Sequence, residues 1–329
     1  MRPYTVNISK RGGINIKAIP LVRKKKRGFF WELSRNRFSY LLVLPALIYV
    51  FIFSYASYPY LAIAFQKFNY VKGIFGSDWI GFENFAFFFK SSDAILITIN
   101  TVKLNLLFLA FGTFFAVSIA ILFNEIRSKL FQKLAQTTMI FPSFLSWVVV
   151  SYMIYGLFST NFGIINQIIH YFGGETINWY TKPDAWTWIL VGMKVWKDAG
   201  LASIIYLAAI AGIDQSLYES ADMDGASRWQ KATRITLPLL APTIAILTLL
   251  SLGKIFYGEF GMIYAIIGDN GVLYPTTDII DTYVFRALRQ VGDPANAAAV
   301  GLFQSTVGFT LVFLANWFTR RFFREGALY

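Results

Sequence analysis

An uncharged stretch of 29 residues, from Phe38 to Gln66, most limits what this chain can fold into. The stretch is rich in apolar and aromatic residues, and a helix needs about 20 such residues to cross the hydrocarbon core of a bilayer. Over the whole chain, 56% of residues are hydrophobic and only 15% are charged, a composition that is unusual for a soluble globular domain. The sequence therefore predicts an integral membrane protein.

Five further apolar stretches follow, and together they predict an all-α, polytopic chain with six transmembrane helices. We expect the spans at residues 38–66, 95–123, 134–158, 185–213, 239–267 and 295–319. The chain then divides into a basic N-terminal segment (1–37), a six-span transmembrane domain (38–319) and a short C-terminal tail (320–329).

The basic residues indicate the orientation of these spans. Of the 30 Lys and Arg residues, 20 lie in segments on the side of the two termini, 6 in segments on the opposite side and 4 within spans. Because cytoplasmic loops are enriched in Lys and Arg, we expect both termini in the cytoplasm, with the run Arg23–Arg27 against anionic lipid. A basic start before an apolar run also resembles a signal peptide. The run is too long and lacks a convincing small-residue cleavage site, so we expect an uncleaved anchor.

What the chain lacks disfavours several classes of function. It contains no cysteine and a single histidine, His170, which leaves almost nothing for a metal site or a histidine-based catalytic triad. The net charge of +12 does not indicate nucleic-acid binding, because the basic residues flank the spans. No Gly-x-x-x-x-Gly-Lys-Ser/Thr phosphate loop occurs. We predict no catalytic residue, no metal ligand and no cofactor in this chain, and we do not expect it to be an enzyme.

The segment between the fourth and fifth predicted spans, residues 214–238, predicts two short helices joined by a turn. Ser216, with Glu219 three residues later, has the spacing of a capping box. Gly225 permits the left-handed backbone that ends a helix, and Pro238 is placed to open the fifth span. We expect a helical hairpin on the cytoplasmic surface.

The spacing within this segment resembles the EAA loop of binding-protein-dependent ABC import permeases, which reads Glu-Ala-Ala, three residues, Gly, nine residues, Ile-x-Leu-Pro. The matching positions are Glu219, Ala221, Gly225, Ile235, Leu237 and Pro238. Ser220 replaces the first alanine. In that family the loop is a coupling helix that sits in a cleft of a separate ATPase subunit. The resemblance implies this role for the matched residues together with Ser220, Asp224 and Arg228.

The resemblance also implies a fold and a set of partners. The fold is that of a type I ABC importer permease in the inner or cytoplasmic membrane of a bacterium. The partners are a second homologous permease, two ABC ATPase subunits that bind ATP and Mg²⁺, and an extracytoplasmic solute-binding protein. The runs 222–227 and 315–321 resemble carbohydrate permeases. The runs 278–286 and 299–304 resemble the branch that imports oligosaccharides of acidic or complex polysaccharides, such as alginate and pectin fragments.

Polar and aromatic residues inside the spans predict a solute pathway. An ionisable group in a bilayer costs roughly 2.5–3.5 kcal/mol on insertion scales unless it is paired or faces water, so we expect these groups to face inward. The predicted pathway residues are Asn100, Lys103, Lys194, Trp196, Lys197, Asp198, Lys254, Tyr257 and Glu259. Lys194 and Asp198 lie four residues apart and can pair on one helical face, so a purely structural role for this couple stays open.

The charge of this pathway suggests the kind of solute. Four lysines against two acids leave the pathway positive by two. Our hypothesis is an anionic solute such as a uronate oligosaccharide, with Lys197 and Lys254 near its carboxylates and Trp196 and Tyr257 near its rings.

Two other functions remain open at this point. One is a permease for neutral oligosaccharides. The other is an ATP-independent secondary transporter or channel, for which charges in the membrane are equally good evidence.

Overall fold

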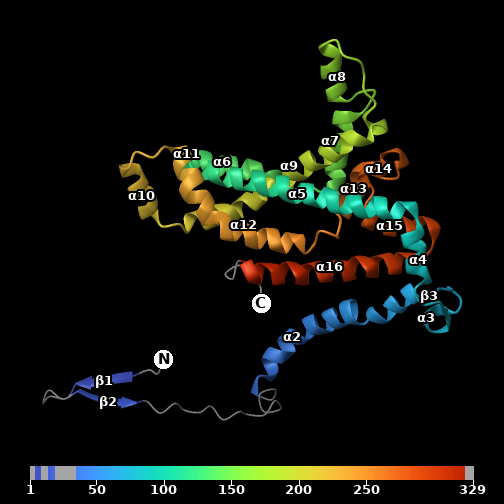
Figure 1. The fold of residues 1–329 in the computed structure, drawn as a ribbon, viewed down its shortest axis with the longest axis horizontal. Coiled ribbons are helices and arrows are strands. Elements are labelled where there is room, and N and C mark those ends of the chain that lie inside the picture. Colours follow the sequence, from blue (N-terminus) through green and yellow to red (C-terminus); the bar gives the residue numbers. More distant parts are fainter. Residues whose placement is uncertain (1–3, 9–13, 19–34, 323–329) are drawn as a thin grey trace. The chain divides into compact units, whose positions relative to one another are not determined.

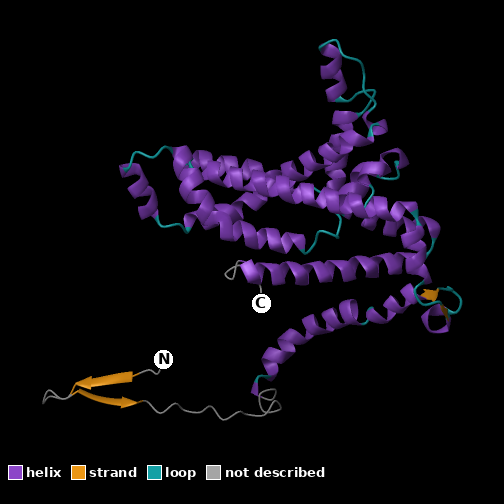
Figure 2. Ribbon diagram, in the orientation of Figure 1, coloured by secondary structure: helices purple, strands orange, loops and turns teal. Residues whose placement is uncertain are grey.

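The computed structural model describes residues 4–8, 14–18 and 35–322, which fall into two compact units, residues 1–59 and 60–329. The predicted lipid-facing run Arg23–Arg27 and residues 323–329 of the predicted tail lie outside the described residues. Most of the described chain is helical, with two pairs of short strands (Figures 1 and 2). The prediction of an all-α chain is confirmed in all but these strands.

The first unit contains a β-hairpin and most of the first predicted span. Strand β1 (Tyr4–Ile8) pairs antiparallel with β2 (Ile14–Ala18). Helix α2 (Arg37–Val50) has no buried residue and continues as the π-helical turn η1 (Phe51–Tyr55). The 3-10 helix η2 (Tyr58–Phe65), most of which belongs to the second unit, completes a run that is long and apolar enough to cross a membrane.

The second unit contains the remaining elements. Its long helices are α5 (Ser92–Asn124), α9 (Pro183–Ala211), α12 (Leu237–Leu252) and α16 (Pro294–Phe322). Shorter elements that precede α9 are β3 (Gln66–Lys67), α3 (Gly73–Gly76), β4 (Asp78–Trp79), α4 (Glu83–Lys90), α6 (Lys129–Ile140), η3 (Phe141–Phe144), α7 (Trp147–Phe158), α8 (Ile164–Tyr171) and η4 (Trp179–Thr181). Shorter elements that follow α9 are α10 (Gln215–Met223), α11 (Arg228–Lys231), η5 (Ala232–Thr236), α13 (Phe260–Ile267), η6 (Gly271–Leu273), α14 (Tyr274–Thr277), α15 (Ile280–Arg286) and η7 (Ala287–Val291).

Six candidate spans agree in number with the prediction. Among the described residues, four helical runs are long and apolar enough to cross a membrane, and two bent helix pairs raise the number to six if each pair is one span. The four runs are Arg37–Phe65, Asp93–Asn124, Arg228–Leu252 and Pro294–Leu314. The bent pairs are Lys129–Phe144 with Trp147–Phe158 and Pro183–Ala211 with Gln215–Met223.

The third predicted span, 134–158, is broken near Pro142 into two helices. Helices α6 and α7 meet at an angle of 98°. Pro142 lies in the 3-10 turn η3 between them, where it cannot donate a backbone hydrogen bond. Ser146 then starts α7 by accepting a hydrogen bond from the backbone N–H of Val149.

The predicted fifth span, 239–267, is also interrupted. Helix α12 ends at Leu252, α13 begins at Phe260, and residues 253–259 between them form turns. Hydropathy alone did not reveal this interruption, because the apolar composition continues on both sides of it. The segment 253–259 is important for the site described below.

The core of the second unit lies along α5 and α9, which run side by side (Figure 1). The fully buried Trp186 and Leu190 of α9 belong to one apolar cluster with Leu104 of α5 and Ile154 of α7. Gly200 lets α9 approach α6, because a Cβ atom at this position would overlap the carbonyl oxygen of Met139. Lipid tails are as apolar as these side chains, so close packing is what holds such helices together in a membrane.

Candidate functional site

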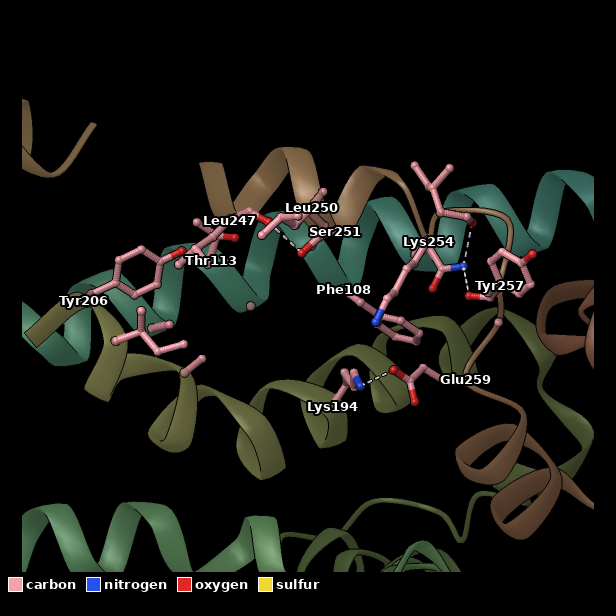
Figure 3. Close-up of a pocket in the computed structure, with 18 residues that line it drawn as sticks. Phe108, Thr113, Lys194, Tyr206, Leu247, Leu250, Ser251, Lys254, Tyr257 and Glu259 are labelled. Atoms are coloured by element: carbon pink, nitrogen blue, oxygen red, sulfur yellow. Dashed lines mark hydrogen bonds and ion pairs between the residues drawn. The ribbon is translucent and has the colours of Figure 1, made fainter. Parts of the chain in front are cut away.

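A cavity of about 540 Å³ opens among α5, α9, α12 and the segment 253–259 (Figure 3). Its wall is mostly apolar, with a few polar groups, as is typical of small-molecule sites. The polar and aromatic residues that line it are Asn105, Phe108, Thr113, Lys194, Tyr206, Ser251, Lys254, Tyr257 and Glu259. The structure thus brings four of the predicted pathway residues together, namely Lys194, Lys254, Tyr257 and Glu259.

Lys194 is held by two carboxylates. Its Nζ atom lies 2.8 Å from Oδ2 of Asp198, one helical turn along α9, and 2.5 Å from Oε1 of Glu259. Because Glu259 immediately precedes α13, this lysine ties α9 to the segment 253–259. The pairing of Lys194 with Asp198 is confirmed. The sequence suggested Lys197 or Lys254 as the partner of Glu259, and the structure pairs it with Lys194.

Lys197 lies behind the cavity and not on its wall. Its Nζ donates a hydrogen bond of 3.0 Å to the carbonyl oxygen of Ser143 and lies 5.1 Å from the ring centroid of Trp147. The nearest carboxylate oxygen, on Asp198, is 3.9 Å away. These contacts satisfy the backbone where α6 and α7 bend, so Lys197 is better placed to support the bend than to meet a solute.

Lys254 is the lysine that remains available in the cavity. Within the described ranges its ammonium group forms no ion pair and no hydrogen bond, and the residue is exposed. Figure 3 shows it reaching from the segment 253–259 toward Phe108 and the Lys194–Glu259 pair.

Three other predicted pathway residues lie away from this cavity. Asn100 is buried, and its side-chain amide donates hydrogen bonds to the carbonyl oxygens of Tyr274 and Pro275. Lys103 is exposed on α5 and does not line this cavity. Trp196 is 41% exposed and does not line the cavity either.

On the wall of this cavity two lysines, Lys194 and Lys254, stand against one acid, Glu259, an excess of one positive charge. The reasoning from sequence missed Asn105, Thr113 and Tyr206, which line the cavity. The signal available was the presence of polar side chains in otherwise apolar spans.

In the part of the chain that the structure describes, no three His, Cys, Asp or Glu side chains come together in a way that could hold a metal ion.

Residues of the segment 278–286 form a second polar cluster. Arg286 donates to both carboxylate oxygens of Asp278, and its guanidinium lies 4.3 Å from the ring centroid of Tyr274. Burial lowers the pKa of Arg286, but the hydrogen bonds and charge of Asp278 outweigh it and raise this pKa overall. The pair closes α15 onto α14, so these two charges are structural.

The helical hairpin predicted at 214–238 is present as α10, a turn at Gly225 and α11. Gly225 has φ = +72°, as predicted for the residue that ends the first helix. The predicted capping box of Ser216 and Glu219 is wrong. Asp214 caps α10 by accepting the backbone N–H of Ser216, and this hydrogen bond lowers the pKa of the Asp214 carboxyl.

The capping box of the hairpin belongs to the second helix. The side chain of Ser227 accepts the backbone N–H of Gln230, and the side chain of Gln230 accepts the backbone N–H of Ser227. Further along, α11 runs through the π-helical turn η5 into α12, where Pro238 lies at the first turn. Pro238 has no N–H to bond to a carbonyl one turn earlier, and this missing hydrogen bond explains the wider π-helical turn that precedes it.

Polar contacts hold the hairpin together and join it to the rest of the second unit. Lys231 pairs with Asp222 at 2.6 Å, which links α11 to α10. Arg228 lies 3.7 Å from Glu125 at the end of α5.

The outer surface of the hairpin forms a hollow of about 350 Å³. Of the predicted coupling residues, Ala221, Asp224, Gly225 and Ile235 line this hollow. Glu219, Ser220, Arg228, Leu237 and Pro238 are exposed around it or near it. The apolar Met223 is 89% exposed and Trp229 is 76% exposed. A mixed polar and apolar surface of this kind is suited to a protein partner.

Comparison with known proteins identifies the family. Residues 110–324 match the family model described as "Binding-protein-dependent transport system inner membrane component". The chain belongs to this family. It is a permease, and the fold expected from the resemblance of residues 214–238 is confirmed.

Relatives and solved structures agree with this assignment. The permease is 36% identical to the "Polygalacturonan/rhamnogalacturonan transport system permease protein YteP" of Bacillus subtilis over 94% of this chain and 96% of the relative. It is 35% identical to "Protein LplB" of the same organism, over 91% of this chain and 94% of that protein. A solved bacterial ABC transporter "involved in the import of the acidic polysaccharide alginate" superposes with a TM-score of 0.81 at 35% identity, over 89% of this chain and 99% of the matched chain.

Proposed function

We propose that this permease imports an acidic oligosaccharide, of the uronate type found in alginate or pectin fragments. The observation that carries the proposal is the unpaired Lys254 in a cavity where Lys194 is already bonded to two carboxylates. One positive charge is then left for an anionic group of the solute. The names of YteP and of the alginate transporter, both for acidic polysaccharides, support the same class of solute.

The cavity also offers groups that suit a sugar. Tyr257 is 43% exposed and Phe108 lines the same wall, so aromatic faces lie close to the ammonium group of Lys254. Asn105 and Ser251 add hydrogen-bonding groups for hydroxyls. A solute with both sugar rings and carboxylates uses all of these features, while a neutral sugar leaves the charge of Lys254 unused.

We further propose that the hairpin α10–α11 docks on a separate ATPase that binds ATP and Mg²⁺. A second permease completes the pathway, and a binding protein delivers the solute. The alginate transporter has been solved in complex with an "alginate pentasaccharide-bound periplasmic protein", which supports a partner of this kind. The distribution of Lys and Arg favours both termini and the hairpin in the cytoplasm of a bacterial cell.

ATP drives transport in this scheme by changing which arrangement of the hairpin is favoured. A ligand shifts a conformational equilibrium only if it binds the two states differently, so the ATP-bound and ATP-free ATPases must hold α10–α11 in different positions. The Lys231–Asp222 pair keeps the two short helices together, and Arg228 passes their movement to Glu125 on α5.

The test is uptake into proteoliposomes that contain the complete complex and its binding protein. Uronate oligosaccharides are compared with neutral oligosaccharides of the same length, with and without ATP. ATP-dependent uptake of the uronates supports the proposal. A preference for neutral sugars would overturn the solute class, and uptake in the absence of the ATPase subunits would overturn the ATP-driven mechanism.

A further inference from the structure

The segment 253–259 carries five of the residues that line the cavity, among them Lys254, Tyr257 and Glu259, yet it is not helical. A helix satisfies its own backbone polar groups, whereas a turn between two apolar helices needs other partners because no bilayer water can supply them. The partners of this segment come from three elements that are distant in sequence.

Asn105 of α5 and Gln304 of α16 bind three successive carbonyl groups of the segment. The side-chain amide of Asn105 donates to the carbonyl oxygen of Ile255 at 2.8 Å and to that of Tyr257 at 3.1 Å. The amide of Gln304 donates to the carbonyl oxygen of Phe256, which lies between them. Gln304 is 5% exposed, so its amide has little alternative contact with water.

Asp281 of α15 binds the next backbone group. Its Oδ2 atom accepts the N–H of Gly258 at 2.7 Å and a second hydrogen bond of 3.0 Å from the amide of Gln304. The approach is so close that a Cβ atom on residue 258 would overlap the side chain of Ile279 and lie 2.7 Å from the same oxygen. Only glycine fits here without displacing a neighbour.

We propose that Asn105, Asp281 and Gln304 form a polar clamp that holds the segment 253–259 in the shape that presents Lys254 and Glu259 to the solute. The clamp binds four successive backbone groups, from the carbonyl of Ile255 to the N–H of Gly258. The two charged residues flank these groups on either side. The three side chains are thus positioning residues, and the inference rests on the proposed function for what the cavity binds.

The natural absence of cysteine allows a direct test of the clamp. Tyr257→Cys places a single thiol in the permease on the cavity wall, and the rate of its labelling by a charged maleimide is measured in the purified full complex without solute. Asp281→Leu removes the acceptor. Gln304→Glu keeps the volume but replaces the donor with an acceptor that faces Asp281.

We expect each of these changes to alter the labelling rate about fivefold, the effect of losing one hydrogen bond on a local opening equilibrium. Asp281→Asn keeps an oxygen acceptor, and its labelling rate is expected to equal that of the permease with Asp281. Gln290→Leu is the matched control, because Gln290 bonds only to the exposed Asp269 outside the clamp; its labelling rate should not change.

Unchanged labelling in both Asp281→Leu and Gln304→Glu would overturn the clamp. Failure of both variants to assemble would also overturn it, because these side chains would then serve folding and not positioning. The solute is tested separately, by binding of uronate and neutral oligosaccharides to the unaltered complex, which keeps Tyr257. If labelling changes while the unaltered complex shows no preference for uronates, the clamp stands and the proposed solute fails.

Discussion

Replacement of Lys254 by glutamine tests the proposed solute most directly. The change removes the one ammonium group of the cavity that has no partner among the described residues, and it keeps a side chain of similar length. We expect the affinity for a uronate oligosaccharide to fall and the affinity for a neutral oligosaccharide of equal length to stay the same.

The magnitude follows from the position of the side chain. Two unit charges 4 Å apart attract by about 1 kcal/mol in water and by about 4 kcal/mol at the effective dielectric constant of a protein surface. Lys254 is exposed to the cavity, so its value lies toward the lower end of this range. A loss of about 1–2 kcal/mol weakens binding by roughly 5- to 30-fold.

The assay is equilibrium binding of labelled oligosaccharides to the purified complex without the binding protein, so that the affinity of the binding protein does not enter. Lys103→Gln is the matched control, since it removes the same charge from α5 outside the cavity. The difference in uronate affinity between the unaltered complex and the Lys254→Gln complex should also shrink at high salt, because exposed charges are screened.

Two results would refute this reasoning. An equal loss of affinity for acidic and neutral oligosaccharides would mean that Lys254 shapes the cavity and does not bind a carboxylate. An equal loss in Lys103→Gln would mean that total charge, and not the cavity, determines the preference.

Three further predictions concern the hairpin, the packing of α9 and the response to pH. Gly225→Val places a β-branched residue in a left-handed conformation that costs roughly 1–2 kcal/mol. Solute-stimulated ATPase activity should fall in an assembled Gly225→Val complex and should fall less in Gly225→Asn. Unchanged ATPase activity would contradict the docking role. Gly200→Ala forces a Cβ atom into the backbone of Met139 and should destabilise the permease by about 1–3 kcal/mol, measured as a lower Tm. Gly192→Ala is the control and should leave the Tm unchanged, because no neighbouring atom lies within 4 Å of its Cβ. Burial raises the pKa of Asp281 above 3.8, so the stability that its carboxyl contributes is complete below pH 3.8 and is lost as the pH rises through the raised pKa. Over this pH range the Tm of the unaltered permease should fall relative to the Tm of Asp281→Asn. A difference in Tm that does not change with pH would contradict the raised pKa.

The helical hairpin shows where local sequence is sufficient. The turn at Gly225 could be predicted because a glycine between two short polar helices has a local conformational reason to be there. The cap at Asp214 was missed for an equally local reason, since Asp214 and Ser216 both have side chains that can cap a helix and the sequence does not say which starts it.

The interruptions in the third and fifth spans show where hydropathy is not sufficient. Both stretches are mostly apolar, so a window average does not distinguish a continuous helix from a broken one. Pro142 was a visible signal for the first interruption. The second involves hydrogen bonds with the side chains of Asn105, Gln304 and Asp281, which lie 150, 48 and 23 residues away from Ile255, Phe256 and Gly258.

The sequence by itself was enough to predict a membrane protein, to place its apolar stretches and to find the loop that carries the family motif. These properties depend on composition and on spacing along one segment, where length and local conformation are decisive. Only the tertiary structure decided which charges meet. Lys194 pairs with Glu259, which is 65 residues away in the sequence, and Lys197 donates to the carbonyl of Ser143 at the α6–α7 bend. Lys254 is then left unpaired in the cavity among the described residues. Helical periodicity defines the face of one helix, but the partner of that face depends on how helices pack and where their backbones break.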